Sequence, residues 1–328
     1  MPRDASTPAG ARAVTAVAPA KINLHLGVGD VRADGYHDLL TVYRAVDLWE
    51  RVTVSLDDDE VVVTGPGAPQ VPTDRTNLAA RAVDLLREEA GSDARIAIRI
   101  HKGVPVAGGM AGGSADAAAA LVATDRLLGL GLGRPALEER AARLGSDVPF
   151  CIRGGTALGT GRGEKLATLL HARAEQHIVV ALADGGLSTP TVFAELDRLR
   201  AERDPADPGR DPADPERGLP RAGGVDPLVV ALAGDDPAAV AGLLANDMEA
   251  AALSLMPALR RTLRVGREAG ALRGMVSGSG PTCLFFCTDR DHAIAVAAEI
   301  SEHGVAREVR VTRGPVGGAH IVDDPTGK

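Results

Sequence analysis

The sequence predicts an α+β protein with two lobes. A chain of 328 residues exceeds a single domain of about 150 residues, which favours two lobes or one large fold. Hydrophobic residues make up 45% of the chain and charged residues 24%, so most of it is expected to fold. Segments with the two-residue period of strands and segments with helical spacing occur in both halves, so each lobe is expected to combine sheet and helices.

The first half contains the longest strand-like segments. Residues 14–28 form the first predicted strand, in which Asn23 and His25 alternate with Ile and Leu and therefore face away from them. Further strands are expected at residues 39–54, 60–64 and 95–101, and helices at residues 77–90, 115–128 and 135–144.

The second half has shorter elements. Helices are expected at residues 193–199, 227–233, 237–245 and 257–269, a strand, glycine turn and strand at 275–288, and a last strand at 307–312. Residues 203–226 break the pattern, because Asp-Pro-Ala-Asp-Pro occurs twice and no apolar period is present. This composition is typical of a solvated, disordered insertion.

Charge and cysteine content exclude several classes of protein. The chain has 36 Lys and Arg against 44 Asp and Glu, and a net charge of −8 argues against a nucleic-acid coat or a binder of anionic membranes. Three cysteines, Cys151, Cys283 and Cys287, are too few for a disulfide framework. The last two flank a strand-like apolar run, so we expect buried apolar side chains and no structural metal site.

No targeting segment is expected. No apolar run reaches the roughly 18–20 residues that span a bilayer. Residues 1–12 contain an aspartate and two prolines without an apolar core, so they are interpreted as a short tail and not as a secretory signal. The expected location is the cytoplasm.

The strongest motif is a glycine-rich loop that leads into a predicted helix. Residues 105–116 read PVAGGMAGGSAD. Because Gly and Ala leave the backbone exposed, the loop amides can point inward, and the helix N-terminus adds partial positive charge. The loop therefore predicts an anion site in which Ser114 donates to a phosphate or contacts Mg²⁺. The alternative is a flexible turn. The sequence has no Walker A motif, complete Rossmann fingerprint or protein-kinase signature.

Together with four other stretches, this loop resembles the GHMP kinase superfamily. Residues 19–24 read PAKINL, and residues 276–282, VSGSGPT, are similar to the C-terminal glycine loop of the family. Residues 34–39, DGYHDL, and 145–150, GSDVPF, narrow the resemblance to the subfamily that phosphorylates a cytidine diphosphate-linked methylerythritol. That reaction belongs to the non-mevalonate route to isoprenoid precursors.

The resemblance implies the two-lobed GHMP kinase fold, with the active site between the lobes. The N-terminal lobe would be ribosomal-protein-S5-like and the C-terminal lobe ferredoxin-like. We place them at residues 13–168 and 169–318, with the insertion in the second lobe and tails at 1–12 and 319–328.

The resemblance also implies a reaction and a set of site residues. The γ-phosphoryl group of MgATP would pass to the 2-hydroxyl of the methylerythritol unit, with Asp147 as the candidate base and Lys21 as its charged partner. The residues assigned to ATP are Pro105, Val106, Ala107, Gly108, Gly109, Met110, Ala111, Gly112, Gly113, Ser114 and Asn77. Those assigned to the substrate are Asn23, Tyr36, His37, Phe193, Thr189, Ser277, Gly278 and Ser279.

Each assignment has a simpler alternative. An Asp before Val-Pro is most often a turn or cap residue, and Lys21 would commonly be a surface lysine. Asn77 would cap a helix, and Phe193 would pack in the core. Tyr36 and His37 would lie on a surface loop, and residues 277–281 would form an ordinary hairpin turn.

Two departures from the family pattern affect the loop. Ala111 stands where the family has Gly, and a side chain there restricts positive φ. Ala115 stands where the family has a second Ser, which leaves Ser114 as the main side-chain donor. Apart from Asp147 no acidic Mg²⁺ ligand stands out, so we assign no protein metal site and expect ATP oxygens and water to hold the ion.

Three other functions stay open at this point. They are another GHMP kinase for a different small alcohol, an inactive GHMP-fold nucleotide sensor, and an RNA-binding protein with an S5-like fold, which the acidic charge disfavours. The expected partner is a small molecule, with no nucleic acid and no membrane. The protein would be a monomer or a homodimer.

Overall fold

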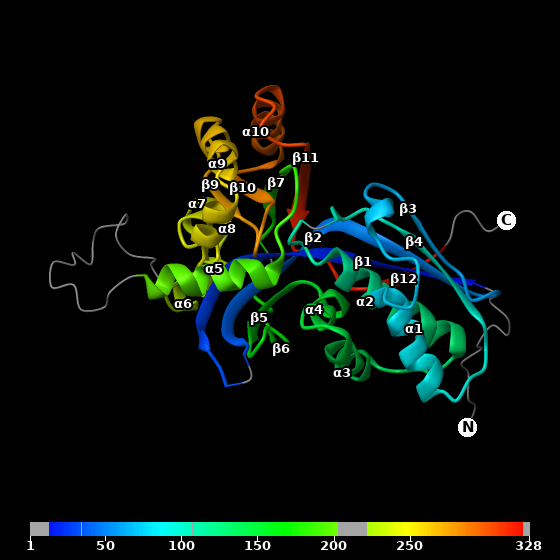
Figure 1. Cartoon of the computed structure of the whole chain (residues 1–328). Coiled ribbons are helices and arrows are strands. Elements are labelled where there is room, and N and C mark those ends of the chain that lie inside the picture. Colours follow the sequence, from blue (N-terminus) through cyan, green and yellow to red (C-terminus); the bar gives the residue numbers. More distant parts are fainter. Residues whose placement is uncertain (1–12, 34, 107, 173, 203–221, 324–328) are drawn as a thin grey trace.

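The computed structural model describes residues 13–33, 35–106, 108–172, 174–202 and 222–323. It contains two β-sheets with helices packed on them (Figure 1). The tail expected at residues 1–12 and most of the expected insertion lie outside the described residues.

The first sheet is built on two long antiparallel strands, β1 (Ala13–Val31) and β2 (His37–Leu56). Its main strand order is β12-β1-β2-β4-β3, where β3 is Val61–Thr64, β4 is Ile96–His101 and β12 is His320–Val322. Off this path, β5 (Thr156–Thr160) joins β2 to β6 (Lys165–Thr168), and β8 (Ala245–Asn246) pairs with β1.

Four helices cover one face of this sheet: α1 (Leu78–Glu89), α2 (Gly112–Leu128), α3 (Arg134–Leu144) and α4 (Val148–Arg153). α2 is fully buried along an alanine-rich face. Small side chains allow the helix to approach the sheet closely, which holds its N-terminus near the end of β4. A short 3₁₀ turn, η1 (Ala68–Gln70), precedes α1.

The second sheet has the order β11-β7-β10-β9 and is antiparallel throughout. Its strands are β7 (Gln176–Leu182), β9 (Arg273–Val276), β10 (Cys283–Cys287) and β11 (Glu308–Gly314). Helices α9 (Leu259–Glu268) and α10 (Arg290–Glu302) lie on its outer face (Figure 1). Four more helices lie between and beside the sheets: α5 (Thr189–Ala201), α6 (Asp226–Ala231), α7 (Pro237–Ala241) and α8 (Glu249–Leu255).

Strand alternation in the second sheet divides the core in two. On β10, Leu284 and Phe286 point toward a core that also holds Ile22 and Leu24 of β1. Phe285, on the opposite face, packs beneath α9 and α10. This is the two-residue period expected of a sheet covered on both faces. The first of these cores joins the two lobes.

A fully buried arginine fixes the connection between the lobes. The guanidinium of Arg44 on β2 donates to the carbonyl oxygens of Ala172, at 3.2 Å, and Ala174, at 3.0 Å. These residues lie between β6 and β7. Burial lowers the pKa of Arg44 to about 9. The connecting segment is therefore bound to the first sheet by a charged donor.

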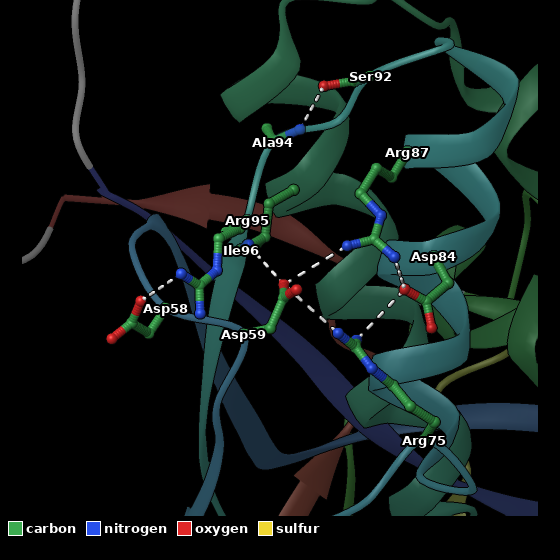
Figure 2. A network of polar contacts seen from close by, with 9 residues as sticks. All are labelled: Asp58, Asp59, Arg75, Asp84, Arg87, Ser92, Ala94, Arg95 and Ile96. Carbon is green, nitrogen blue, oxygen red and sulfur yellow. Dashed lines mark hydrogen bonds and ion pairs between the residues drawn. The ribbon is translucent and has the colours of Figure 1, made fainter.

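A polar network ties the middle and end of α1 to the segments around it (Figure 2). The Asp59 carboxylate accepts from the backbone N–H of Ile96 at 3.0 Å and lies 3.4 Å from both Arg75 and Arg87. The backbone hydrogen bond, followed by the arginine charges, lowers the pKa of Asp59. Both arginines also pair with Asp84 of α1, so the network ties the turn after β2 to this helix.

The α+β class expected for both lobes is confirmed. The strand expected at 307–312 is not the last one, because β12 returns to the first sheet from within the segment interpreted as a tail. The helix expected at 237–245 ends at Ala241, and β8 follows it. The lobe boundary stays a prediction. All three cysteines are free and buried, as expected.

No helix in the described part of the chain is both long enough and apolar enough to cross a bilayer.

We predict that Gly266→Ala destabilises the protein although alanine favours helices. A Cβ on Gly266 in α9 would lie 2.1 Å from a ring carbon of Phe285, which is fully buried. Overpacking of this kind costs about 1–3 kcal/mol and outweighs the helix preference of roughly 1 kcal/mol. Urea denaturation monitored by circular dichroism measures the free energy of unfolding.

The matched control is Gly242→Ala at the end of α7. Gly242 has φ −67°, and an added Cβ would make only ordinary contacts at 3.6 Å or more. This change should be neutral or slightly stabilising, because alanine restricts the unfolded chain. Equal effects of the two substitutions would contradict the packing argument.

Candidate active site

Two cavities lie beside the glycine-rich loop of residues 105–116. The larger one, of about 850 Å³, opens where β1, β2 and α5 meet this loop and the C-terminal glycine loop of residues 276–282. Lys21 and Asp147 lie at one end, beside Tyr43, and the rings of Tyr36, His37 and Phe193 gather at the other. Of the predicted site residues, the lining includes Lys21, Asn23, Tyr36, His37, Gly109, Ala111, Asp147, Thr189, Phe193, Gly278 and Ser279. The structure therefore brings together residues from all five motifs.

Lys21 is held at the end of a buried hydrogen-bond chain. Thr41 donates to the carbonyl oxygen of His25 and accepts from the amide nitrogen of Asn23, each at 2.7 Å. The amide oxygen of Asn23 accepts from Lys21 Nζ at 2.9 Å, and this ammonium lies 3.4 Å from Oδ2 of Asp147. Every member of the chain except Asp147 is buried, so the ammonium has little freedom.

Asp147 is available for chemistry. It occupies the N-cap position of α4, but its side chain makes no capping hydrogen bond and is 30% exposed. Its carboxylate pairs instead with Lys21, which is 7% exposed. The simpler alternatives for these residues, a helix cap and a surface lysine, therefore do not describe this pair.

The glycine-rich loop separates two cavities. A smaller one, of about 320 Å³, lies on its other side, next to Gln70, Val71 and Pro72. Its lining also includes Pro105, Val106, Gly108, Gly109, Met110, Ala111, Gly112 and Gly113. Gly109 and Ala111 line both cavities, so the backbone of the loop is their shared wall. Ala107 lies outside the described residues.

Ala111 adopts the backbone conformation that its side chain disfavours. It has φ 59° and ψ 34° and is the N-cap of α2, and no other described non-glycine residue has positive φ. A left-handed alanine costs on the order of 1–2 kcal/mol. The loop therefore keeps the conformation expected of a glycine, with the first amides of α2 unoccupied by a capping side chain. Ser114 lies half-buried in this first turn.

The loop packs directly on the C-terminal glycine loop. A Cβ on Gly109, which has φ +69°, would lie 2.7 Å from the carbonyl oxygen of Ser277. Asn246 donates from its side-chain amide to the carbonyl oxygens of Val276 and Gly278, both at 2.8 Å. Ser277 is fully buried and does not line the larger cavity, whereas Gly278 and Ser279 do. Thr189 and Ser279 share a hydrogen bond of 3.0 Å.

The side chain of Asn77 forms hydrogen bonds with the backbone on both sides of it. Its side chain accepts from the backbone N–H of Ala79 at 2.8 Å and donates to the carbonyl oxygen of Pro72 at 2.7 Å. Asn77 caps α1, as the alternative interpretation stated, and does not line either cavity. Its side chain instead fixes Pro72, which lines the smaller cavity.

Aromatic residues gather at the far end of the larger cavity. The ring of His37 stacks on Phe193 with centroids 4.8 Å apart and planes 14° from parallel. Its Nε2 lies 2.9 Å from Oδ1 of Asp197, which comes one turn after Phe193 on α5. Tyr36 is 55% exposed, and the guanidinium of Arg162 lies 5.2 Å from its ring centroid. This end offers flat surfaces and hydrogen-bonding edges.

Among the lining residues that sequence reasoning missed, three contact the predicted site residues. Tyr43 faces Lys21 at 5.1 Å, and burial followed by the Asp147 carboxylate raises its pKa well above its usual range. Asp197 and Arg162 were also not identified. The four-residue spacing of Phe193 and Asp197 on a predicted helix was an available signal. Arg162 lies between β5 and β6, which were not expected.

A divalent ion at this site would take most of its ligands from phosphate and water, because the nearby acidic side chains are paired with lysines. No three His, Cys, Asp or Glu side chains gather as a metal site within the described residues. Asp147 pairs with Lys21, and Asp116 pairs with Lys102 in a buried position. Ser114 offers a neutral oxygen in the first turn of α2, but it lines neither cavity. Mg²⁺ commonly binds to nucleotide phosphates with few protein oxygens.

Two family models match the chain. The model described as the GHMP kinases N terminal domain matches residues 77–155, and that described as the GHMP kinases C terminal matches residues 228–306. The chain is 56% identical over 307 residues to 4-diphosphocytidyl-2-C-methyl-D-erythritol kinase of Nocardia farcinica, covering 93% of this chain and 95% of that one. The enzyme of the same name from Mycolicibacterium smegmatis is 54% identical over 314 residues, with 95% and 94% coverage.

Solved structures agree with these relatives. A crystal structure of 4-(cytidine 5'-diphospho)-2C-methyl-D-erythritol kinase has a TM-score of 0.70 at 31% identity, covering 92% of this chain and all of that one. A homoserine kinase from Cytophaga hutchinsonii has a TM-score of 0.72 at 18% identity over 98% of this chain and all of that one, which shows the fold alone. The two-lobed fold, the order of the motifs and the sequence identity over nearly the whole chain all indicate the same family. The chain belongs to the 4-diphosphocytidyl-2-C-methyl-D-erythritol kinases of the GHMP kinase superfamily.

Proposed function

We propose that this protein transfers the γ-phosphoryl group of ATP to the 2-hydroxyl of 4-diphosphocytidyl-2-C-methyl-D-erythritol. The observation that carries the proposal is the shared wall between the two cavities, formed by Gly109 and Ala111. A nucleotide on one side of the loop and an alcohol on the other would meet at its backbone amides. The Lys21 and Asp147 pair lies on the alcohol side. The relatives at 54–56% identity carry the name of this activity.

Phosphoryl transfer depends mainly on position and charge. In the proposed reaction Asp147 accepts the proton of the 2-hydroxyl as its oxygen attacks the γ-phosphorus. Lys21 holds this carboxylate in place and stabilises the negative charge on the attacking oxygen. Its own position is fixed by the hydrogen bond to Asn23. The amides at the start of α2 stabilise negative charge on the transferred phosphoryl group. ADP and the 2-phosphate are the products.

Mg²⁺ is proposed to accompany ATP. Bound to the phosphate oxygens, it would neutralise part of their charge during transfer. Ser114 is the residue we expect to offer it a protein oxygen. Since the reaction consumes ATP, we place the enzyme in the cytoplasm.

The cytidine group is proposed to bind at the aromatic end. The rings of Tyr36 and Phe193 offer faces for the pyrimidine, and His37 offers a hydrogen-bonding edge. Asp197, 2.9 Å from His37, would fix which ring nitrogen carries a proton. Thr189 and Ser279, which share a hydrogen bond, line the same cavity and are proposed to contact the substrate there.

We predict that Asp147→Asn lowers kcat by a factor on the order of 10² to 10⁴, the usual contribution of a positioned general base. The amide is the same size but cannot take a proton, so the affinity for the cytidyl substrate should change little. ADP release with MgATP measures turnover, with mevalonate and homoserine tested beside the cytidyl substrate.

The control is Asp291→Asn, an exposed carboxylate on α10 in the second sheet's outer layer, which should leave kcat unchanged. Turnover of mevalonate or homoserine in place of the cytidyl substrate would replace the proposal with another alcohol kinase. Full turnover by the Asp147→Asn variant would remove Asp147 from its proposed role.

Phe193→Ala should raise KM for the cytidyl substrate on the order of tenfold, because loss of stacking on a base costs about 1–3 kcal/mol. KM for ATP should stay the same, since Phe193 lines only the larger cavity. Steady-state kinetics with each substrate varied in turn gives both constants.

Leu199→Ala is the matched control for this change. Leu199 lies on the same helix and packs in the same small core as Phe193, but it does not line the cavity. It should lower stability without raising KM for the cytidyl substrate. If both variants raise that KM equally, the effect comes from α5 packing and not from base stacking.

A further inference from the structure

A buried charge cluster lies beneath the glycine-rich loop and takes no part in the proposed phosphoryl transfer. Lys102, the residue after β4, places Nζ 2.6 Å from Oε1 of Glu50 and 2.5 Å from Oδ2 of Asp116. Glu50 comes from β2 and Asp116 from α2. The three side chains are at most 3% exposed. We call these three residues the loop-base cluster.

The loop-base cluster supports the loop by direct contact. A Cβ on Gly112, the first residue of α2, would lie 3.0 Å from Oε1 of Glu50 and 3.5 Å from Nζ of Lys102. Both Lys102 and Asp116 line the smaller cavity. The charged groups therefore lie against the helix turn whose amides face the proposed phosphate position.

Backbone contacts extend the cluster to the second lobe. The second carboxylate oxygen of Glu50 accepts from the N–H of Gly103 at 2.9 Å. The carbonyl oxygen of Gly103 accepts from Arg310 of β11 at 2.6 Å. Arg310 also pairs with Glu308, so its charge is already compensated. The base of the loop is thus connected to β2, α2 and the second sheet.

The cluster holds more carboxyl groups than ammonium groups. One ammonium faces two carboxyl groups, and Oδ1 of Asp116 has no hydrogen-bond partner among the described residues. Burial raises the pKa of both carboxyl groups, and the neighbouring Asp116 helps to raise that of Glu50 to about 7. Lys102 opposes both shifts. Its ammonium is the positive charge that contacts both carboxyl groups.

We propose that the loop-base cluster positions the phosphate groups of ATP, with the ammonium of Lys102 supplying positive charge that attracts them. Glu50 and Asp116 in turn hold the ammonium beneath the first turn of α2. None of the three is a catalytic residue, since their contacts are to one another and to the loop. The inference rests on the proposed function only in placing an adenine nucleotide in the smaller cavity.

The test compares two variants that remove charges of opposite sign, Lys102→Met and Asp116→Asn. The asparagine can keep the contact to Lys102 through its oxygen and place its NH₂ where Oδ1 has no partner, so the fold should be retained. Calorimetry measures binding of adenosine, AMP, ADP and a non-hydrolysable ATP analogue to each full-length variant.

For Lys102→Met we expect unchanged adenosine binding and a loss that grows with each phosphate, to about tenfold or more for the triphosphate. For Asp116→Asn we expect the opposite sign, with triphosphate binding about threefold tighter and adenosine unchanged. The control Lys165→Met removes an exposed lysine of β6 and should leave all four affinities unchanged.

A purely structural cluster would give a different result. Both variants would then bind the triphosphate more weakly, or would lose adenosine and triphosphate binding alike, and either result overturns the inference. If Lys102→Met does not fold, the sign of the Asp116→Asn effect decides. A wild-type chain that binds no adenine nucleotide would overturn the proposed function as well.

Discussion

β1 is buried on both faces from residue 14 to residue 28, and a strand in that position must find a partner for each polar side chain that it carries. One set of its side chains, which includes Ala18, Ile22 and Leu26, contributes to three separate cores. The other set includes Lys21 and Asn23, which are buried along the strand and line the larger cavity. The lobes are therefore held together by the same strand that presents the polar residues of the site.

The geometry of the site follows from that burial. Asn23 can satisfy its amide only by donating to Thr41 and accepting from Lys21, and the ammonium then faces Asp147. Because the oxygen and the nitrogen of the buried Asn23 amide each have a hydrogen-bond partner, the amide has a single favourable orientation. The lysine is therefore held in place without any contact from a ligand. His25 is the exception. Its Nε2 has no partner among the described residues, and burial lowers its pKa, which favours the neutral ring.

The local sequence was sufficient to predict an element where its apolar residues have a clear strand or helix period, or where it contains a motif. The alternation around Asn23 predicted β1, and the alanine-rich run after the glycine loop predicted α2. β7 and α10 were missed, although both have apolar faces, because short apolar runs do not distinguish a strand from a helix. β12 could not be predicted, since a three-residue strand exists only through its pairing with β1. Asp197 was missed for a similar reason, because its role depends on His37, the first residue of β2, which lies 160 positions away.

Ala111 shows why the two glycine loops have to be considered together. Its left-handed conformation is unfavourable alone, yet the chain on either side is fixed. Gly109 is packed against the carbonyl oxygen of Ser277, and Gly112 rests on Glu50 and Lys102. With both neighbours held, the loop cannot relax the strain without breaking the contact between the lobes or uncovering a buried charge cluster. The conformation that a glycine would adopt freely is here imposed by packing, which explains how the loop tolerates a methyl group beside the shared wall of the two cavities.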